Sequence, residues 1–252
     1  MKHRSIVAAS MALGLTVVLA QARPGAAEEI TVLCSNGLKA VIEDLVPKFE
    51  RETKHKVVVK YGLAALLTQR IEGGEAFDVA FVTPAMMDGL IAKGKVAADS
   101  RAIIARSGLA FAIRAGARKP DVSSADAFTR ALRNAKSIAY AKEGASGVLF
   151  AALVQKLGMA DDLKPKSRLA ASGEEVSAAV VNGDAELGVL PLSEVLPIKG
   201  AEPMIFPAEV QQYIVMAGGV RAGSRLAAAR DLMEYVTGPA ALPVIRAKGM
   251  EK

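Results

Sequence analysis

The sequence contains no tryptophan, and aromatic residues make up only 4% of it. Sugar-binding sites usually stack their ligand on aromatic rings, so this scarcity argues against a sugar ligand. Only two histidines are present, His3 and His55. A serine–histidine relay needs a histidine base, and a zinc site needs several histidine or cysteine ligands. His55 has no such partners in the sequence, and Ser146 in "GASG" lacks the G-x-S-x-G spacing, so we predict that the protein is not an enzyme.

The single cysteine, Cys34, excludes an internal disulfide. It follows the apolar run "ITVL", well beyond the place where a lipid-attachment cysteine would follow a leader segment. We therefore interpret Cys34 as a buried thiol at the end of a strand. No Cys/His cluster indicates a metal site, and we predict no cofactor.

The first 27 residues have the pattern of a secretory signal peptide. Lys2 and Arg4 form a basic start, an uncharged apolar run follows, and small residues precede Glu28, so cleavage is expected after Ala27 or Ala22. A transmembrane anchor is the alternative, but the run is short and contains several Ala, Ser and Gly residues. We expect a soluble, periplasmic mature protein.

Removal of the leader leaves a mature chain with little net charge. Without the three basic residues of the leader it has 29 basic and 26 acidic residues, a net charge of +3. This charge is too small to indicate nucleic acid as a partner.

Short apolar runs alternate with helical patterns along the mature chain. This alternation predicts an α/β protein with a mainly parallel sheet. Strands are predicted at residues 30–34, 56–61, 77–83, 108–116, 137–141, 185–192 and 211–220, with a further extended segment at "PMIFP". Helical patterns follow most of these runs, and the last two are "SRLAAARDLMEYVTGP" and the tail "AALPVIRAKGM".

Three junctions between a strand and a helix are rich in small residues. They are Ser35-Asn36-Gly37, residues 62–65 and the loop "KEGASG" at 142–147. Each would offer backbone N–H donors at the positive end of a helix, which suits an anion. In open α/β sheets ligands bind at such places, so we expect the three junctions to contribute to one site.

Several long segments, in this order, resemble the periplasmic substrate-binding proteins of molybdate-type ABC importers. They are "ITVLCSNGLKAVIEDLVPKFERETKHKVVVKYG", "QRIEGGEAFDVAFVT", "GLAFAIRAGA", "AELGVLPLSEV" and "YVTGPAALPVIRAKGM". The resemblance implies a two-lobed type II binding-protein fold, in which each lobe is a mostly parallel sheet flanked by helices. It places lobe I at residues 28–112 and 211–252 and lobe II at 113–210, with crossovers near 112–114 and 209–212.

The resemblance also implies ligand positions in lobe I, although family hydroxyls are replaced there. The serine of the first ligand loop falls on Gly37, with Ser35 and Asn36 close enough in sequence to supply a side chain instead. The serine of the second loop falls on Leu63 or Ala64, neither of which carries a hydroxyl.

In lobe II the resemblance implies backbone donors near Ser146 and at Val176. The family tyrosine falls on Pro191, which has neither a hydroxyl nor an N–H, and Ser193 is the nearest hydroxyl. Each missing charge-assisted hydrogen bond would remove about 1.5–3 kcal/mol of binding energy.

Two ligands remain open at this stage. The resemblance implies capture of a small oxyanion of the molybdate or tungstate type, delivered by a monomer to an ABC permease. A small di- or tricarboxylate is the alternative, because it would tolerate Leu63 and Pro191 better and could pair with Lys142 or Arg70.

Overall fold

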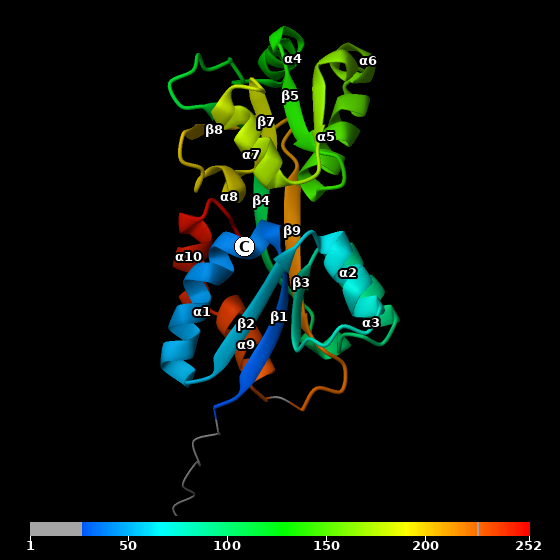
Figure 1. Cartoon of the computed structure of the whole chain (residues 1–252), viewed down its shortest axis with the longest axis vertical. Coiled ribbons are helices and arrows are strands. Elements are labelled where there is room, and N and C mark those ends of the chain that lie inside the picture. Colours follow the sequence, from blue (N-terminus) through cyan, green and yellow to red (C-terminus); the bar gives the residue numbers. More distant parts are fainter. Residues whose placement is uncertain (1–26, 226) are drawn as a thin grey trace, which may run out of the picture.

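The computed structural model describes residues 27–225 and 227–252. The predicted signal peptide therefore lies outside the described residues, apart from Ala27. Figure 1 shows two lobes stacked along the long axis of the molecule, and two long strands run between them. None of the helices within the described ranges is long and apolar enough to cross a membrane.

Lobe I, the lower lobe in Figure 1, contains the N-terminal and C-terminal parts of the chain. Its strands are ordered β2-β1-β3-β9-β4; β1 is parallel to β2 and β3, and β9 is antiparallel to β3 and β4. The strands are β1 (Glu29–Ser35), β2 (Lys56–Gly62), β3 (Val79–Val82), β9 (Tyr213–Val220) and the first part of β4 (Ala102–Arg114). The helices are η1 (Asn36–Leu38), α1 (Lys39–Thr53), α2 (Ala64–Glu72), α3 (Pro84–Ala92), η2 (Ala98–Ser100), α9 (Ala227–Thr237), η4 (Pro239–Ala241) and α10 (Leu242–Ala247).

Lobe II repeats the strand–helix alternation on the rest of β4. Its order is β4-β7-β5-β6, with β8 on the other edge of β4; β5 is parallel to β6 and β7, whereas β4 is antiparallel to β7 and β8. The strands are β5 (Ile138–Ala141), β6 (Ser167–Ala170), β7 (Leu187–Pro191) and β8 (Ala201–Ile205). The helices are α4 (Ala125–Asn134), α5 (Ala145–Lys156), α6 (Ala160–Leu163), η3 (Lys164–Lys166), α7 (Gly173–Asn182) and α8 (Leu192–Val195).

Strand β4 belongs to both sheets. From Ala102 to Gly108 it pairs with β9, and from Leu109 onward it pairs with β7 and β8. The change of partner therefore falls between Gly108 and Leu109, whereas the sequence places the change of lobe at 112 and 113.

The second connection between the lobes is the segment from β8 to β9, and Gln211 ties it to β4. The Gln211 side-chain oxygen accepts hydrogen bonds from the Leu109 N–H (2.7 Å) and the Gln212 N–H (2.9 Å), and its amide donates to the Leu109 carbonyl oxygen (3.2 Å). A Cβ on Gly108 would lie 2.9 Å from the Gln211 amide nitrogen, so glycine leaves room for this contact. The Gln211 side chain thus makes the hydrogen bonds that backbone groups would make, and it joins the two crossovers at the point where β4 changes sheets.

Aromatic packing holds the same connection to the core of lobe II. Phe206, which follows β8, lies with its ring centroid 4.6 Å from that of Phe111 in β4 and 4.7 Å from that of Phe128 in α4. All three side chains are buried, and each removes a large apolar area from water.

The two-lobed α/β fold that the sequence predicts is the observed one. The main differences are in short or interrupted elements. β4 begins at Ala102 instead of 108, and α5 begins at Ala145, inside the loop predicted at 142–147. Cys34 is fully buried at the end of β1, as predicted.

Gly147 allows α5 to start directly against the end of β5. A Cβ at this position would lie 1.8 Å from the Ala141 carbonyl oxygen, which is backbone and cannot rotate away. The close approach fixes where the first turn of α5 lies.

We predict that Gly147→Ala lowers the free energy of unfolding by at least about 1–3 kcal/mol, because the methyl group would push α5 off β5. Gly89→Ala is the matched control: Gly89 lies inside α3 with nothing within 4 Å of a new Cβ, so it should stabilise the protein by about 0.4–1 kcal/mol. Urea unfolding measures both. Equal effects of the two substitutions would contradict the proposed close approach.

Candidate functional site

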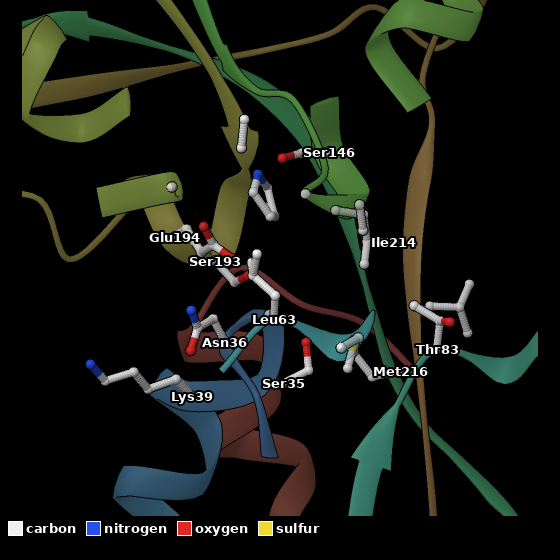
Figure 2. Close-up of a pocket in the computed structure, with 18 of the residues that line it drawn as sticks. Ser35, Asn36, Lys39, Leu63, Thr83, Ser146, Ser193, Glu194, Ile214 and Met216 are labelled. Carbon is white, nitrogen blue, oxygen red and sulfur yellow. The ribbon is translucent and has the colours of Figure 1, made fainter. Parts of the chain in front are cut away.

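A large cavity lies where the two lobes face each other. Its volume is about 1040 Å³, slightly above the range of about 300–1,000 Å³ that is usual for organic-ligand pockets. Both lobes contribute to its wall, and Figure 2 shows Ser35 and Thr83 of lobe I on the side opposite Ser146 of lobe II.

The cavity lies at the carboxyl ends of six strands. In lobe I, β1, β2 and β3 end there and lead into η1, α2 and α3; in lobe II, β5, β6 and β7 lead into α5, α7 and α8. The first turn of a helix has N–H groups without partners inside the helix, and its end carries partial positive charge. Because several longer helices begin at this wall, the backbone makes the cavity suitable for a negatively charged guest.

Eight of the nine residues predicted for the site line this one cavity. They are Ser35, Asn36, Gly37, Leu63, Ala64, Ser146, Pro191 and Ser193. The ninth, Val176, is fully buried and does not line the cavity, and its N–H donates to the carbonyl oxygen of Ser172 (3.2 Å), the N-cap residue of α7. Gly173 and Glu174, at the first turn of the same helix, take its place on the wall.

The two cations considered for an organic anion lie elsewhere. Arg70 donates to Glu75 (2.6 Å) on the surface of lobe I, and Lys142 is exposed and does not line the cavity. Lys39 is the lysine on the wall, but its ammonium lies 5.5 Å from the centre of the Tyr61 ring. Figure 2 shows Lys39 pointing away from the middle of the cavity.

The side chains of the wall are mostly apolar or acidic. Leu63, Ile214 and Met216 contribute apolar surface. Four glutamates also reach the wall, namely Glu43, Glu143, Glu174 and Glu194. The attraction for an anion therefore comes from backbone dipoles and hydroxyl groups, because the charged side chains on balance repel it.

Glu194 is the glutamate with the most perturbed acidity. Burial, and secondarily the negative charge of Glu174, raises the pKa of its carboxyl to about 7. Among the described residues the Glu194 carboxyl has no hydrogen bond or ion pair. Sequence analysis missed both Glu194 and Thr83. Thr83 is the last residue of the strand predicted at 77–83, and the expectation that ligands bind at strand ends could have found it.

Ser193 contributes a hydroxyl without a partner. Its N–H donates to the Ser107 hydroxyl oxygen (3.1 Å), which ties α8 to β4. Its own hydroxyl is the only buried side-chain polar group in the described part of the chain that makes no hydrogen bond. Such a group in the wall of a cavity is available to a guest.

The only histidine in the described residues has a different environment. His55 stacks on Phe49 (6.0 Å between ring centroids), and its Nδ1 accepts a hydrogen bond from the Glu28 N–H (3.2 Å). His55 does not line the cavity, so it does not lie beside the serines there. Within the described ranges, no three Asp, Glu, His or Cys side chains are grouped as a metal ion would require.

A two-lobed α/β molecule with helix starts converging on an interlobe cavity has the architecture of a solute-binding protein. The model of the family described as bacterial extracellular solute-binding protein matches residues 30–251, and the chain belongs to this family.

The relatives of this chain are named for different ligands and activities. The chain is 32% identical to a Pseudomonas aconitate isomerase over 88% of this chain and 87% of that one. It is 28% identical to the molybdate-binding protein of Azotobacter vinelandii, over 95% and 94% of the two chains. A solved structure of the periplasmic molybdate-binding protein from Azotobacter vinelandii superposes with a TM-score of 0.75 at 22% identity, covering 88% of this chain and 99% of that one. The resemblance to the molybdate-type binding proteins is thus confirmed.

We predict that Ser193→Ala raises the free energy of unfolding of the ligand-free protein by about 1 kcal/mol, because it removes a buried hydroxyl that has no partner. Ser107→Ala is the matched comparison: it removes the acceptor of the Ser193 N–H and should destabilise by about 1–2 kcal/mol. Urea unfolding at neutral pH measures both. A destabilised Ser193→Ala variant would mean that the hydroxyl serves the fold instead of a guest.

Proposed function

We propose that the mature protein captures a small organic polycarboxylate in the interlobe cavity and presents it to the permease of an ABC importer. The observation that carries this proposal is the combination of helix starts with apolar wall residues such as Leu63 and Ile214. Helix N-termini suit carboxylates, and the apolar surface suits the carbon skeleton between them.

The size and the hydroxyl content of the cavity favour an organic anion over a bare oxyanion. An ion with one central atom and four oxygens would fill only a small part of about 1040 Å³. The positions where molybdate-type sites have hydroxyls are here Gly37, Leu63 or Ala64, and Pro191. The name of the Pseudomonas relative, an aconitate isomerase, points to the same class of ligand.

An oxyanion is the second candidate ligand. It is favoured by the relatives named molybdate-binding proteins and by the convergent helix starts, which hold an anion without a countercharge. Ser35, Ser146 and Ser193 would then supply hydroxyl donors.

We propose binding without turnover, because the family is one of binding proteins. The name of the Pseudomonas relative supports isomerisation of a bound polycarboxylate as the competing possibility. Proton NMR of trans-aconitate incubated with the protein distinguishes them: an unchanged spectrum is expected, and formation of the cis isomer at a rate proportional to protein concentration would contradict a pure binding role.

The cellular setting is part of the same proposal. The leader at residues 1–27 would direct the protein to the periplasm, where it would act as a monomer. Lobe I would comprise 28–112 and 211–252, lobe II 113–210, and the lobes would close on the ligand about β4 and the segment tied by Gln211.

Calorimetry on the mature protein tests the ligand class. We expect cis-aconitate, trans-aconitate, tricarballylate or citrate to bind, and molybdate, tungstate and sulfate to bind at least tenfold more weakly. Thermal shift with the same compounds gives an independent measurement. Tight binding of molybdate with no response to any organic acid would overturn the proposal in favour of the second candidate.

A further inference from the structure

Glu194 lies within the cavity wall beside the unpartnered Ser193 (Figure 2). Its carboxyl faces the start of α7, since a Cβ on Gly173 would lie 2.6 Å from Glu194 Oε2. The same wall would contact a polycarboxylate, so Glu194 brings a carboxyl group to a site whose guest is itself negative.

Among the residues that the structure describes, no cation forms an ion pair with Glu194. The other titratable side chains on the cavity wall are Lys39 and Glu43 of α1, Glu143 before α5, Glu174 of α7 and Tyr213 of β9. Of these, Lys39 lies over Tyr61, and Glu174 adds negative charge that disfavours ionisation of Glu194.

The elements packed around α8 also leave Glu194 without a countercharge. On β4, Arg106 is paired with Glu251 (3.2 Å). On β8, Glu202 is paired with Lys119 (2.7 Å), and on the C-terminal segment Lys248 is paired with Asp44 (2.9 Å). The remaining cation of β4, Arg114, approaches Gly183 at the far end of α7.

Two ionised carboxylates in contact repel each other, and the repulsion grows when a bound ligand displaces water from the cavity. A shared proton removes the repulsion and adds a short charge-assisted O–H···O bond. We infer that Glu194 meets its polycarboxylate ligand across one shared proton, so that capture of the fully ionised ligand takes up a proton. This inference rests on the proposed function.

The proton must come from the solvent only when Glu194 is ionised in the free protein. Because burial and Glu174 raise the pKa of its carboxyl to about 7, little proton uptake is needed at pH 6. Above pH 7 the affinity for a fully ionised polycarboxylate should fall tenfold for each pH unit, which is the slope for one proton. Glu194 therefore favours a ligand whose carboxylate can share a proton with it in a hydrogen bond.

Calorimetry with trans-aconitate and tricarballylate at pH 6.0, 7.0, 8.0 and 8.5 tests the inference. Titrations in two buffers with different ionisation enthalpies count the protons taken up. We expect the wild-type protein to take up close to one proton at pH 8.5. The amide of Glu194→Gln keeps a hydrogen-bond donor but does not ionise. This variant should bind the acids about as tightly as wild type at pH 6 and take up no proton. At pH 8.5 its affinity should exceed that of wild type by about tenfold or more.

Glu209→Gln is the matched control, because it makes the same change in net charge on an exposed residue outside the cavity. It should keep the wild-type pH slope. A flat wild-type slope, or a Glu194→Gln variant with the wild-type slope, would overturn the inference while leaving polycarboxylate binding intact. No binding of either acid at any pH to wild type or Glu194→Gln would instead overturn the proposed function and the inference with it.

A ligand-free measurement checks the titration of Glu194. Its carboxyl has a raised pKa in the folded protein, so the folded state holds a proton that the unfolded chain has lost between pH 4.5 and about 7. Wild-type stability should therefore fall relative to Glu194→Gln as the pH rises through this window and stay at the lower level above it. A difference in melting temperature that does not change between pH 4.5 and 8 would contradict a Glu194 carboxyl that titrates with a raised pKa.

Discussion

The arrangement of the molecule depends on one strand that is shared by two sheets. Because β4 pairs with β9 up to Gly108 and with β7 and β8 from Leu109, each sheet is continuous with the other through a single run of backbone. Gln211 completes this junction by hydrogen bonding as if it were backbone. The two sets of strand ends face each other because the lobes share this junction, and every feature of the cavity follows from that placement.

In the cavity the backbone attracts a negatively charged guest, whereas the charged side chains repel it. Helix starts from both lobes provide positive potential that is fixed in place, whereas the glutamates around the wall provide negative charge. A guest must therefore place its charges against the backbone and present something other than a bare charge to Glu194. The Ser193 hydroxyl, which has no hydrogen-bond partner, lies beside Glu194. Two polar groups of the wall that lack partners are therefore neighbours in sequence.

Long elements were predictable from the sequence because their periodicity extends over several turns or residues. The helix predicted at "SRLAAARDLMEYVTGP" is an example, and it contains α9 (Ala227–Thr237). β6 and α8 escaped prediction because each has only a few residues, too short for a period to show. β4 was predicted too short because Arg106 and Ser107 interrupt its apolar pattern; in the structure Arg106 lies 4.6 Å from the centre of the Tyr213 ring, and Ser107 accepts the Ser193 N–H.

The candidate site was predicted in outline for a similar reason. Small residues after strands mark helix starts, and these do converge, but which lining groups lack partners depends on contacts between distant segments. The raised pKa of the Glu194 carboxyl comes from desolvation and from the charge of Glu174. No local pattern in "PLSEV" indicates either cause. Val176 was a wrong prediction of another kind. Its N–H was expected to be free for a ligand, but it donates to the Ser172 carbonyl oxygen at the start of the same helix.

The end of the chain lies close to the cavity, not at the outer tip of a lobe (Figure 1). Met250 lines the cavity, and Gly249 lies so close to Leu192 of α8 and to Leu196 just after it that a Cβ there would approach them to within 3 Å. A fluorophore, purification handle or surface linker joined to Lys252 would therefore be positioned beside the mouth of the pocket. The start of β1 lies at the opposite end of lobe I (Figure 1), so a label near Glu29 would be far from the cavity, whereas one on Lys252 could report occupancy.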